Sequence, residues 1–232
     1  MFFLTFKQTF NLNERLILPL NHYGMNFNEK QIRIIEIAER MFAEQGYVGT
    51  SIRDIAKKSG INIAMVSYYF GSKEKLMEAI FKYRTEQAWF SMQETFLNSD
   101  IAPDEKIFKL LDSFLERIGE KAFFHSIVIR QQLLGERSPV IHQLDEAKQY
   151  HHNLVKKVIA EGQEKGIFRK DVDIAMIMVT MVGISYQFLA SSNFYCKVSG
   201  LGYDKDTPFN NNLKALLREH LHKIFKALLF NQ

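Results

Sequence analysis

The chain has 232 residues, of which 47% are hydrophobic, and it contains only four prolines and twelve glycines. This length allows either one large domain or a small domain followed by a body of about 150 residues. The net charge of +4 is too small for a chain that is basic over its whole surface, so any charge that matters must be local. Long periodic segments, without repeats or low-complexity tracts, favour a mostly helical protein.

Three further features limit the function classes. A single cysteine, Cys196, excludes an internal disulfide and favours a reducing cytoplasm, with a sensor thiol as the alternative. Residues 1–24 are rich in Phe and Leu but are broken by polar residues, which does not fit a secretory signal. We expect this segment to be an extension outside the core fold or an ordered arm. The longest uncharged run, 174–190, is short for a membrane span, so we expect a buried or interface helix there.

The first predicted elements are three helices with clear ends. Asn28 followed by Gln31 resembles a capping box, and apolar positions then recur at helical spacing as far as a stop at Gly46. Ser51 and Asp54 predict the start of a second helix that ends before Gly60. The third helix is expected to be capped by Asn62 and to end near residue 70.

The rest of the chain predicts six more helices. Pro103 occupies a favoured first-turn position, and Gly166 marks a connection that continues to residue 170. The expected ranges are 72–97, 103–120, 122–134, 138–165, 171–192 and 207–229. Residues 193–206 are expected to form the longest loop.

The excess positive charge lies in one segment. Between Thr50 and Arg84 there are five Lys and two Arg against one Asp and two Glu, which is a net charge of +4. The remaining 197 residues therefore sum to about zero. A phosphate-binding surface requires this kind of local excess.

The helix expected at 62–70 has two distinct faces at 100° per residue. Ile63, Val66 and Phe70 cluster on one face, which would hold the helix against its own domain. Ala64, Met65 and Tyr68 point the other way, with Tyr69 beside them. Adjacent exposed tyrosines indicate a contact surface.

The segment from Ser51 to Leu76 resembles the N-terminal domain of TetR-type transcriptional regulators. The matching residues are Ser51-Ile52-Arg53-Asp54-Ile55-Ala56, Gly60, Tyr68, Phe70, Lys73 and Leu76, after a helix that ends with Phe42, Gly46 and Tyr47. The segment 166–173 (GIFRKDVD) is similar to a connection before the eighth helix of that family. Two departures are Ala64, where many members have glycine, and Ser67-Tyr68-Tyr69, where many have two aromatics and a histidine.

The resemblance implies an all-α protein of about nine helices. Its domains would be an N-terminal extension at 1–24, a homeodomain-like three-helix helix-turn-helix domain at 25–72, and a helical effector-binding and dimerisation domain at 73–232. In such a unit the second helix of the motif enters the major groove of DNA.

The resemblance also implies the DNA contacts. Tyr68, Tyr69 and Lys73 are the expected phosphate contacts, and free N–H groups at helix N-termini can bind phosphate as well. Arg53 would contact a phosphate or a base, unless it pairs with Asp54 or Glu74. The full expected set is Thr50, Ser51, Arg53, Asn62, Ile63, Ala64, Met65, Ser67, Tyr68, Tyr69 and Lys73.

Dimerisation is expected through the last two helices, because family members resemble each other in being two-fold dimers. The eighth and ninth helices would pair with their copies as a four-helix bundle. The expected interface residues are Ala175, Val179, Gly183, Gln187, Leu217, Leu221 and Phe225. The alternative is that the eighth helix is buried within its own chain.

A ligand pocket is expected among the middle helices, where the sequence is rich in aromatic residues. Such pockets are mostly hydrophobic with a few polar groups, which suits an apolar or aromatic effector. The candidates are Trp89, Phe90, Phe114, Phe123, Phe124, His125, Tyr150, His151, Phe168 and Tyr186, and each of them is also compatible with ordinary core packing.

The predicted function is DNA-binding transcriptional regulation, with repression favoured by the resemblance. A homodimer would bind a (pseudo)palindromic operator and be released by a small effector, with the helix at 72–97 carrying the movement. The alternative is an effector-independent architectural or division-related DNA-binding protein. We expect no enzyme activity, cofactor or metal, since no phosphate loop or metal-ligand spacing is present, and His151 and His152 point about 100° apart on a helix.

Overall fold

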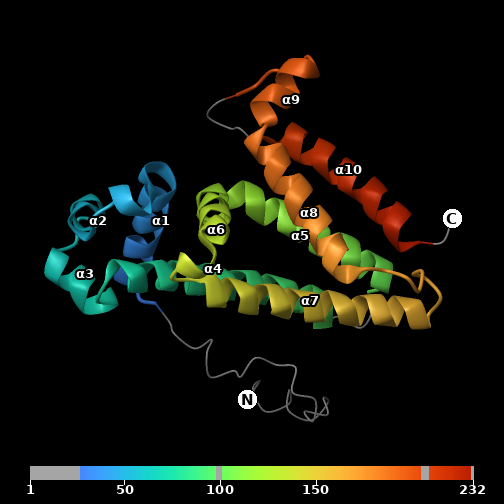
Figure 1. The fold of residues 1–232 in the computed structure, drawn as a ribbon, viewed down its shortest axis with the longest axis horizontal. Helices are drawn as coiled ribbons and strands as arrows, with labels where there is room; N and C mark the ends of the chain where they lie inside the picture. Colours follow the sequence, from blue (N-terminus) through green and yellow to red (C-terminus); the bar gives the residue numbers. More distant parts are fainter. Residues whose placement is uncertain (1–26, 98–100, 205–208, 231–232) are drawn as a thin grey trace, which may run out of the picture.

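The computed structural model describes residues 27–97, 101–204 and 209–230, without the side chains of residues 89–91 and 93–97. The expectations for residues 1–24 therefore lie outside the described residues. The described residues form ten α-helices and one short 3₁₀ helix, which confirms the all-α class. Figure 1 shows an elongated molecule with α1, α2 and α3 at one end and the C-terminus at the other.

The head consists of α1 (Glu29–Gly49), α2 (Ile52–Ser59) and α3 (Ile63–Phe70). Each helix begins at the predicted cap, since the side chains of Asn28, Ser51 and Asn62 accept hydrogen bonds from the first turns of α1, α2 and α3. The capping box of Asn28 and Gln31 is complete. At Gly46, φ is +78°, and this glycine kinks α1 rather than ending it.

The body contains the longer helices. They are α4 (Lys73–Leu97), α5 (Pro103–Glu120), α6 (Ala122–Leu134), η2 (Gly135–Arg137), α7 (Ile141–Glu164), α8 (Ile174–Ala190), α9 (Ser192–Val198) and α10 (Asn211–Leu229). Helices α4 and α7 contact each other along the long axis of the molecule (Figure 1). The bounds of α5 and α6 are those that the sequence predicts.

The expected loop at 193–206 is wrong in its first part, where α9 forms instead. Helix α9 buries Ser192 and Cys196, which are four residues apart and so lie on one face. Tyr195 also packs on Phe188 of α8 with a centroid distance of 5.0 Å. Tertiary packing thus decides a segment whose local helix preference is weak.

The head and the body share one hydrophobic core. Fully buried Ile34, Ile55 and Val66 from α1, α2 and α3 pack with residues of α4. Ile127 of α6 and Leu144 of α7 belong to the same cluster. The division of the chain at residue 72 stays a prediction, and this core crosses it.

A second core fills the opposite end of the body. It joins buried residues of α5, α7, α8 and α10, among them Leu115, Val158 and Ile177. Gly162 of α7 allows a close approach here, because a Cβ atom at Gly162 would lie 2.1 Å from the ring of Phe168. The expectation that Phe168 lines a ligand pocket is therefore wrong, because this side chain is buried in the second core.

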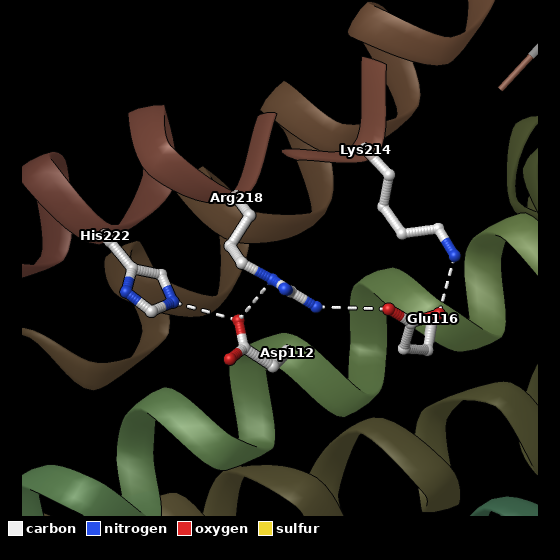
Figure 2. Close-up of polar contacts among 5 residues, drawn as sticks. All are labelled: Asp112, Glu116, Lys214, Arg218 and His222. Carbon is white, nitrogen blue, oxygen red and sulfur yellow. Dashed lines mark hydrogen bonds and ion pairs between the residues drawn. The ribbon is translucent and has the colours of Figure 1, made fainter. Parts of the chain in front are cut away.

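Charged side chains join α5 to α10 beside this second core (Figure 2). Asp112 lies 2.9 Å from Nε2 of His222 and 3.1 Å from Nε of Arg218. Glu116 pairs with Arg218 at 3.1 Å and with Lys214. These five side chains link α10 to α5 by ion pairs.

Within the described ranges, no single helix is both long enough and apolar enough to cross a membrane. The bent pair of α8 and α9, with an angle of 73° between the helices, passes the same test of length and apolar composition when the two are taken together.

Candidate nucleic-acid interface and ligand cluster

The turn between α2 and α3 is fixed by Gly60. Its φ of +68° places it in the left-handed region, and its N–H group donates to the carbonyls of Ala56 and Lys57. Asn62 then caps α3 with a 2.8 Å hydrogen bond from the N–H group of Ala64. Two short helices joined in this way form a helix-turn-helix unit.

One face of helix α3 packs against the core of the head, and the other face is exposed to solvent. Val66 and Phe70 are 0% and 7% exposed, whereas Tyr68 is 81% exposed. The expected inner position of Ile63 is wrong, because this side chain is 43% exposed. Ile63 lies in the first turn, where the helix leaves the core, so it joins Ala64, Met65 and Ser67 on the free face.

The two tyrosines of α3 have different surroundings. Tyr69 is half-buried and packs against the shared core, with its ring centroid 6.3 Å from that of Phe70. Tyr68 lies outside it, 5.7 Å from Tyr69. Tyr69 therefore presents less surface than Tyr68, and the two rings lie side by side.

Two expected contacts have structural duties inside the head. Thr50 is 1% exposed, and its hydroxyl hydrogen-bonds the carbonyls of Met41 and Gly46. Lys73 donates to the carbonyls of Tyr47 at 2.9 Å and Thr50 at 3.1 Å. The side chain of Thr50 is thus unavailable to DNA, and Lys73 joins the first turn of α4 to the end of α1.

Arg53 is exposed at the start of α2, and neither expected acidic partner engages it. Ser51 donates to the carboxylate of Asp54, and Tyr47 donates to Glu74 at 2.8 Å. Within the described residues, Arg53 forms no ion pair with either of them. Helix α2 also exposes two lysines, Lys57 and Lys58. The family motif does not include them, so they are absent from the expected DNA contacts. The local excess of positive charge is the signal that could have indicated them.

The middle of the body brings four of the expected pocket residues together. A 2.9 Å hydrogen bond joins Nδ1 of His125 on α6 to the hydroxyl of Tyr186 on α8. The rings of Phe114 and Phe124 lie 6.3 and 5.7 Å from that of His125. Burial, followed by the charge of Arg117, lowers the pKa of His125 to about 4. Burial also raises the pKa of Tyr186, so both groups are neutral near pH 7.

A second pair of candidates lies on α7. Tyr150 and His151 have ring centroids 5.9 Å apart. Burial and then the charge of Arg117 lower the pKa of His151 to about 4, as they do for His125. Arg117 thus influences both histidines, although the sequence gives no signal that a partly buried charged residue lies here.

The other pocket candidates have different outcomes. Phe123 is 43% exposed, with the guanidinium of Arg40 5.6 Å from its ring centroid, so its inclusion in a pocket is wrong. The side chains of Trp89 and Phe90 lie outside the described residues. No group of three or more metal-ligating side chains occurs among the residues that the structure describes.

Helix α8 exposes the face that the sequence predicts for a dimer. Val179 is 64% exposed, and Ala175, Gly183 and Gln187 are exposed with it. A groove of about 650 Å³ runs from Gly183 and Gln187 to Leu216 and His220 of α10. The uncharged helix α8 is therefore only partly covered by its own chain.

The expectation that three residues of α10 lie in the dimer interface is wrong. Leu217, Leu221 and Phe225 are 2%, 0% and 3% exposed and belong to the second core of the protomer itself. The opposite face of α10 presents Leu216 and Leu228, which are 37% and 40% exposed. Both faces carry apolar side chains, so periodicity alone cannot say which one faces the body.

The helix-turn-helix with its free α3 face defines the class, a DNA-binding regulator with an all-helical body. Residues 34–80 match the family described as bacterial regulatory proteins, tetR family, and residues 103–207 match the tetracyclin repressor-like C-terminal domain. The chain therefore belongs to the TetR family of transcriptional regulators, which are DNA-binding proteins and not enzymes.

Curated relatives are named as repressors. The transcriptional repressor KstR2 of Mycobacterium tuberculosis is 26% identical over 154 residues, which cover 65% of this chain and 74% of that protein. The repressor NicS of Pseudomonas putida is 28% identical over 177 residues, which cover 74% of this chain and 80% of NicS. This chain is similar to both over most of their lengths.

Solved structures share the fold. The ketosteroid regulator KstR2 of Mycobacterium tuberculosis has a TM-score of 0.68 at 19% identity, covering 89% of this chain and 98% of that one. The fatty acid degradation regulator FadR of Bacillus halodurans has a TM-score of 0.69 at 19% identity, covering 86% and 96%. At these identities the likeness concerns the fold alone.

Proposed function

We propose that this regulator is a repressor that binds a (pseudo)palindromic operator as a homodimer and is released by a small ligand in its body. The free face of α3 carries the DNA-binding part of the proposal. Ile63, Ala64, Met65 and Ser67 would face the major groove, with Met65 or Ala64 near thymine methyl groups. A protein with this task acts where the chromosome lies, and we propose the cytoplasm.

The phosphate contacts would flank α3. Tyr68 projects from the free face, and Arg53 and Ser51 lie at the N-terminus of α2, where the helix dipole favours a phosphate. The half-buried Tyr69 is a positioning residue for Tyr68. Lys73 would act indirectly by holding the junction of α1 and α4, because its ammonium group donates to the backbone carbonyls of Tyr47 and Thr50.

The exposed face of α8 supports dimerisation. An apolar side chain such as Val179, 64% exposed on an uncharged helix, is stabilised when a partner covers it. At Gly183 there is open space where a Cβ atom would lie, so a second helix can approach closely. We propose that α8 and the outer face of α10, with Leu216 and Leu228, pair with their copies about a two-fold axis.

Helix α6 would carry the release signal, together with the predicted link α4. It bears His125 at the ligand cluster and Ile127 in the core that it shares with α1. Arg130 of α6 also donates to the carbonyl of Phe42 at 3.3 Å. A ligand that binds better when α6 has shifted would thus favour a head position unsuited to the operator.

The effector-free architectural alternative is less well supported. Buried polar atoms in a finished core normally have hydrogen-bond partners. In the body, Nη1 of Arg117 and Oγ of Ser185 are shielded from solvent and have none among the described residues. Such atoms favour a body that is completed by a ligand.

The first experiment measures binding to a fluorescent duplex of the DNA upstream of the regulator's own gene, across a salt series. We expect salt-dependent binding of one dimer per site. The Tyr68→Ala variant should bind about tenfold or more weakly without losing thermal stability, because a charge-assisted contact is removed from an exposed side chain. The exposed Lys157→Ala, on α7 beside the second core at the other end of the body, is the control.

The dimer is tested in the same preparation by sedimentation. Val179→Glu places a charge in the proposed interface and should give folded monomers with unchanged helical content and weaker operator binding. A Val179→Glu protein that stays dimeric would contradict the proposed interface. Binding without preference over random DNA would favour the architectural alternative.

A further inference from the structure

Arg117 of α5 has an unusual environment for a charged residue. Its Nη1 atom is shielded from solvent and has no hydrogen-bond partner among the residues described. Glu120 raises the pKa of Arg117 through its charge, but burial outweighs it, and within the described ranges no carboxylate forms an ion pair with this guanidinium. The preceding residue, Glu116, is held by Lys214 and Arg218 of α10.

The neighbours of Arg117 do not neutralise it. His125 and His151, whose pKa values its charge lowers, are themselves neutral near pH 7. Tyr186 is un-ionised because burial raises its pKa. The cluster therefore holds the positive charge of Arg117 beside neutral hydrogen-bonding groups, and the exposed Glu120 offsets this charge only in part, without an ion pair.

An isolated charge of this kind costs free energy unless a counter-charge compensates it. Two rings, Phe114 and Phe124, lie beside His125 at the edge of the same cluster. A ligand with an anionic group and an apolar part would satisfy both features. The planar fork of a guanidinium matches a carboxylate with two parallel hydrogen bonds.

We propose that Arg117 binds the carboxylate of the effector, with the His125–Tyr186 pair as neutral hydrogen-bonding partners and the apolar part of the effector against Phe114 and Phe124. This inference rests on the proposed function only in calling the ligand an effector. It sharpens the expectation of an apolar or aromatic effector by adding one negative charge. The same positive charge disfavours a cationic ligand.

The test compares acids with neutral analogues of the same shape on the purified full chain without DNA. Octanoate is paired with octanamide, and phenylacetate with phenylacetamide, in calorimetric titrations and thermal unfolding. We expect at least one acid to bind about 10- to 100-fold more tightly than its amide, the range for a charged hydrogen-bonded contact. Acids that bind no better than their amides in both pairs would overturn the proposal.

Two variants separate charge from packing. Arg117→Met keeps much of the side-chain length but removes the charge, and it should abolish the preference for the acid. Arg117→Lys should keep part of it. Arg137→Met makes the same chemical change at an exposed position of η2 and should leave the preference unchanged.

The readout does not depend on operator binding. If Arg117→Met fails to fold, the acid–amide comparison on the unaltered chain and on Arg117→Lys still tests whether Arg117 binds a carboxylate. An acid preference that persists in a folded Arg117→Met protein would overturn the proposal. Release of operator DNA by neutral or cationic compounds alone would overturn the Arg117 proposal and leave the proposed function intact. Binding of an acid by a protein that binds no operator would support the Arg117 proposal and contradict the proposed function.

Discussion

The head and the body of this regulator treat their polar groups differently. In the head, the hydroxyl of Thr50 and the ammonium of Lys73 both have internal partners, and the unpaired polar and apolar groups lie on the free surface of α3. In the body, Arg117 and Ser185 keep unpartnered atoms in the interior. The difference agrees with the proposed function, in which the head reads DNA and the body takes up an effector.

The joint between the two regions contains a buried ion pair and gives the largest expected effect. Arg84 of α4 contacts Glu39 of α1 at 2.7 and 3.2 Å, with side chains 7% and 6% exposed. Glu39→Ala leaves the guanidinium buried without its partner, so we expect a loss of about 3–5 kcal/mol in the free energy of unfolding. Urea denaturation at fixed protein concentration measures it.

The matched control is the exposed pair of Arg40 and Glu44 on the same helix, at 2.7 Å. Glu44→Ala should lower the free energy of unfolding far less than Glu39→Ala does, because a solvated pair contributes little. Equal losses for Glu39→Ala and Glu44→Ala would contradict the view that the joint depends on the buried pair.

The core of the body gives the next effect. Leu221 of α10 is fully buried against its own protomer, so Leu221→Ala should lower the free energy of unfolding by about 2–5 kcal/mol. The exposed Leu216→Ala should change it by much less, and should instead weaken the dimer. A reversed order in denaturation and sedimentation would restore the original expectation that Leu221 faces the partner.

The partly buried His125 and His151 predict a pH dependence that belongs to the body. Their pKa of about 4 in the folded chain lies below the unfolded value of 6.5. Between these values the unfolded chain binds more protons, so the free energy of unfolding is largest above pH 6.5 and falls as the pH drops toward 4. The loss is at most about 3 kcal/mol per histidine.

Chemical denaturation at pH 7 and pH 5 measures this loss. His151→Gln removes one titrating group and should reduce the difference between the two pH values. An unchanged difference in His151→Gln, and also in His125→Gln, would assign the pH dependence to other groups.

The smallest effect is expected at the ion-pair network of Figure 2. Its side chains are partly exposed, from 16% for Lys214 to 43% for Glu116, so solvent weakens each pair. Glu116→Gln should therefore cost about 1 kcal/mol or less at low salt, and the cost should shrink in 1 M salt. A loss as large as that of Glu39→Ala would show that α5 and α10 depend on these charges more than on the core beneath them.

Local signals predicted much of the fold. The caps at Asn28, Ser51 and Asn62 and the proline at 103 each act within one helical turn, and the helices begin where they indicate. Features decided by partners distant in sequence were not predictable in this way. Helix α9, the inward face of α10 and the first-turn exposure of Ile63 all depend on what packs against them.

The candidate sites follow the same division. The residue types of α3 and their spacing indicated its free face, while the internal bonding of Thr50 and Lys73 required knowledge of where the end of α1 lies. The aromatic cluster around His125 was foreseen as a set of residue types. The unpartnered Nη1 atom of Arg117 was not, because nothing in the neighbouring sequence indicates which groups surround this side chain.

The core that joins α1, α2 and α3 to Ile127 and Leu144 also has a consequence for protein engineering. A head cut from this chain near residue 72 would lose the side chains of α4, α6 and α7 that cover Ile34 and Phe42. Chimaeric regulators that graft a foreign body onto this head should therefore fold only when α6 and the neighbouring turns of α4 and α7 are transferred with it. The unit of exchange is then a discontinuous block of the chain and not the N-terminal motif.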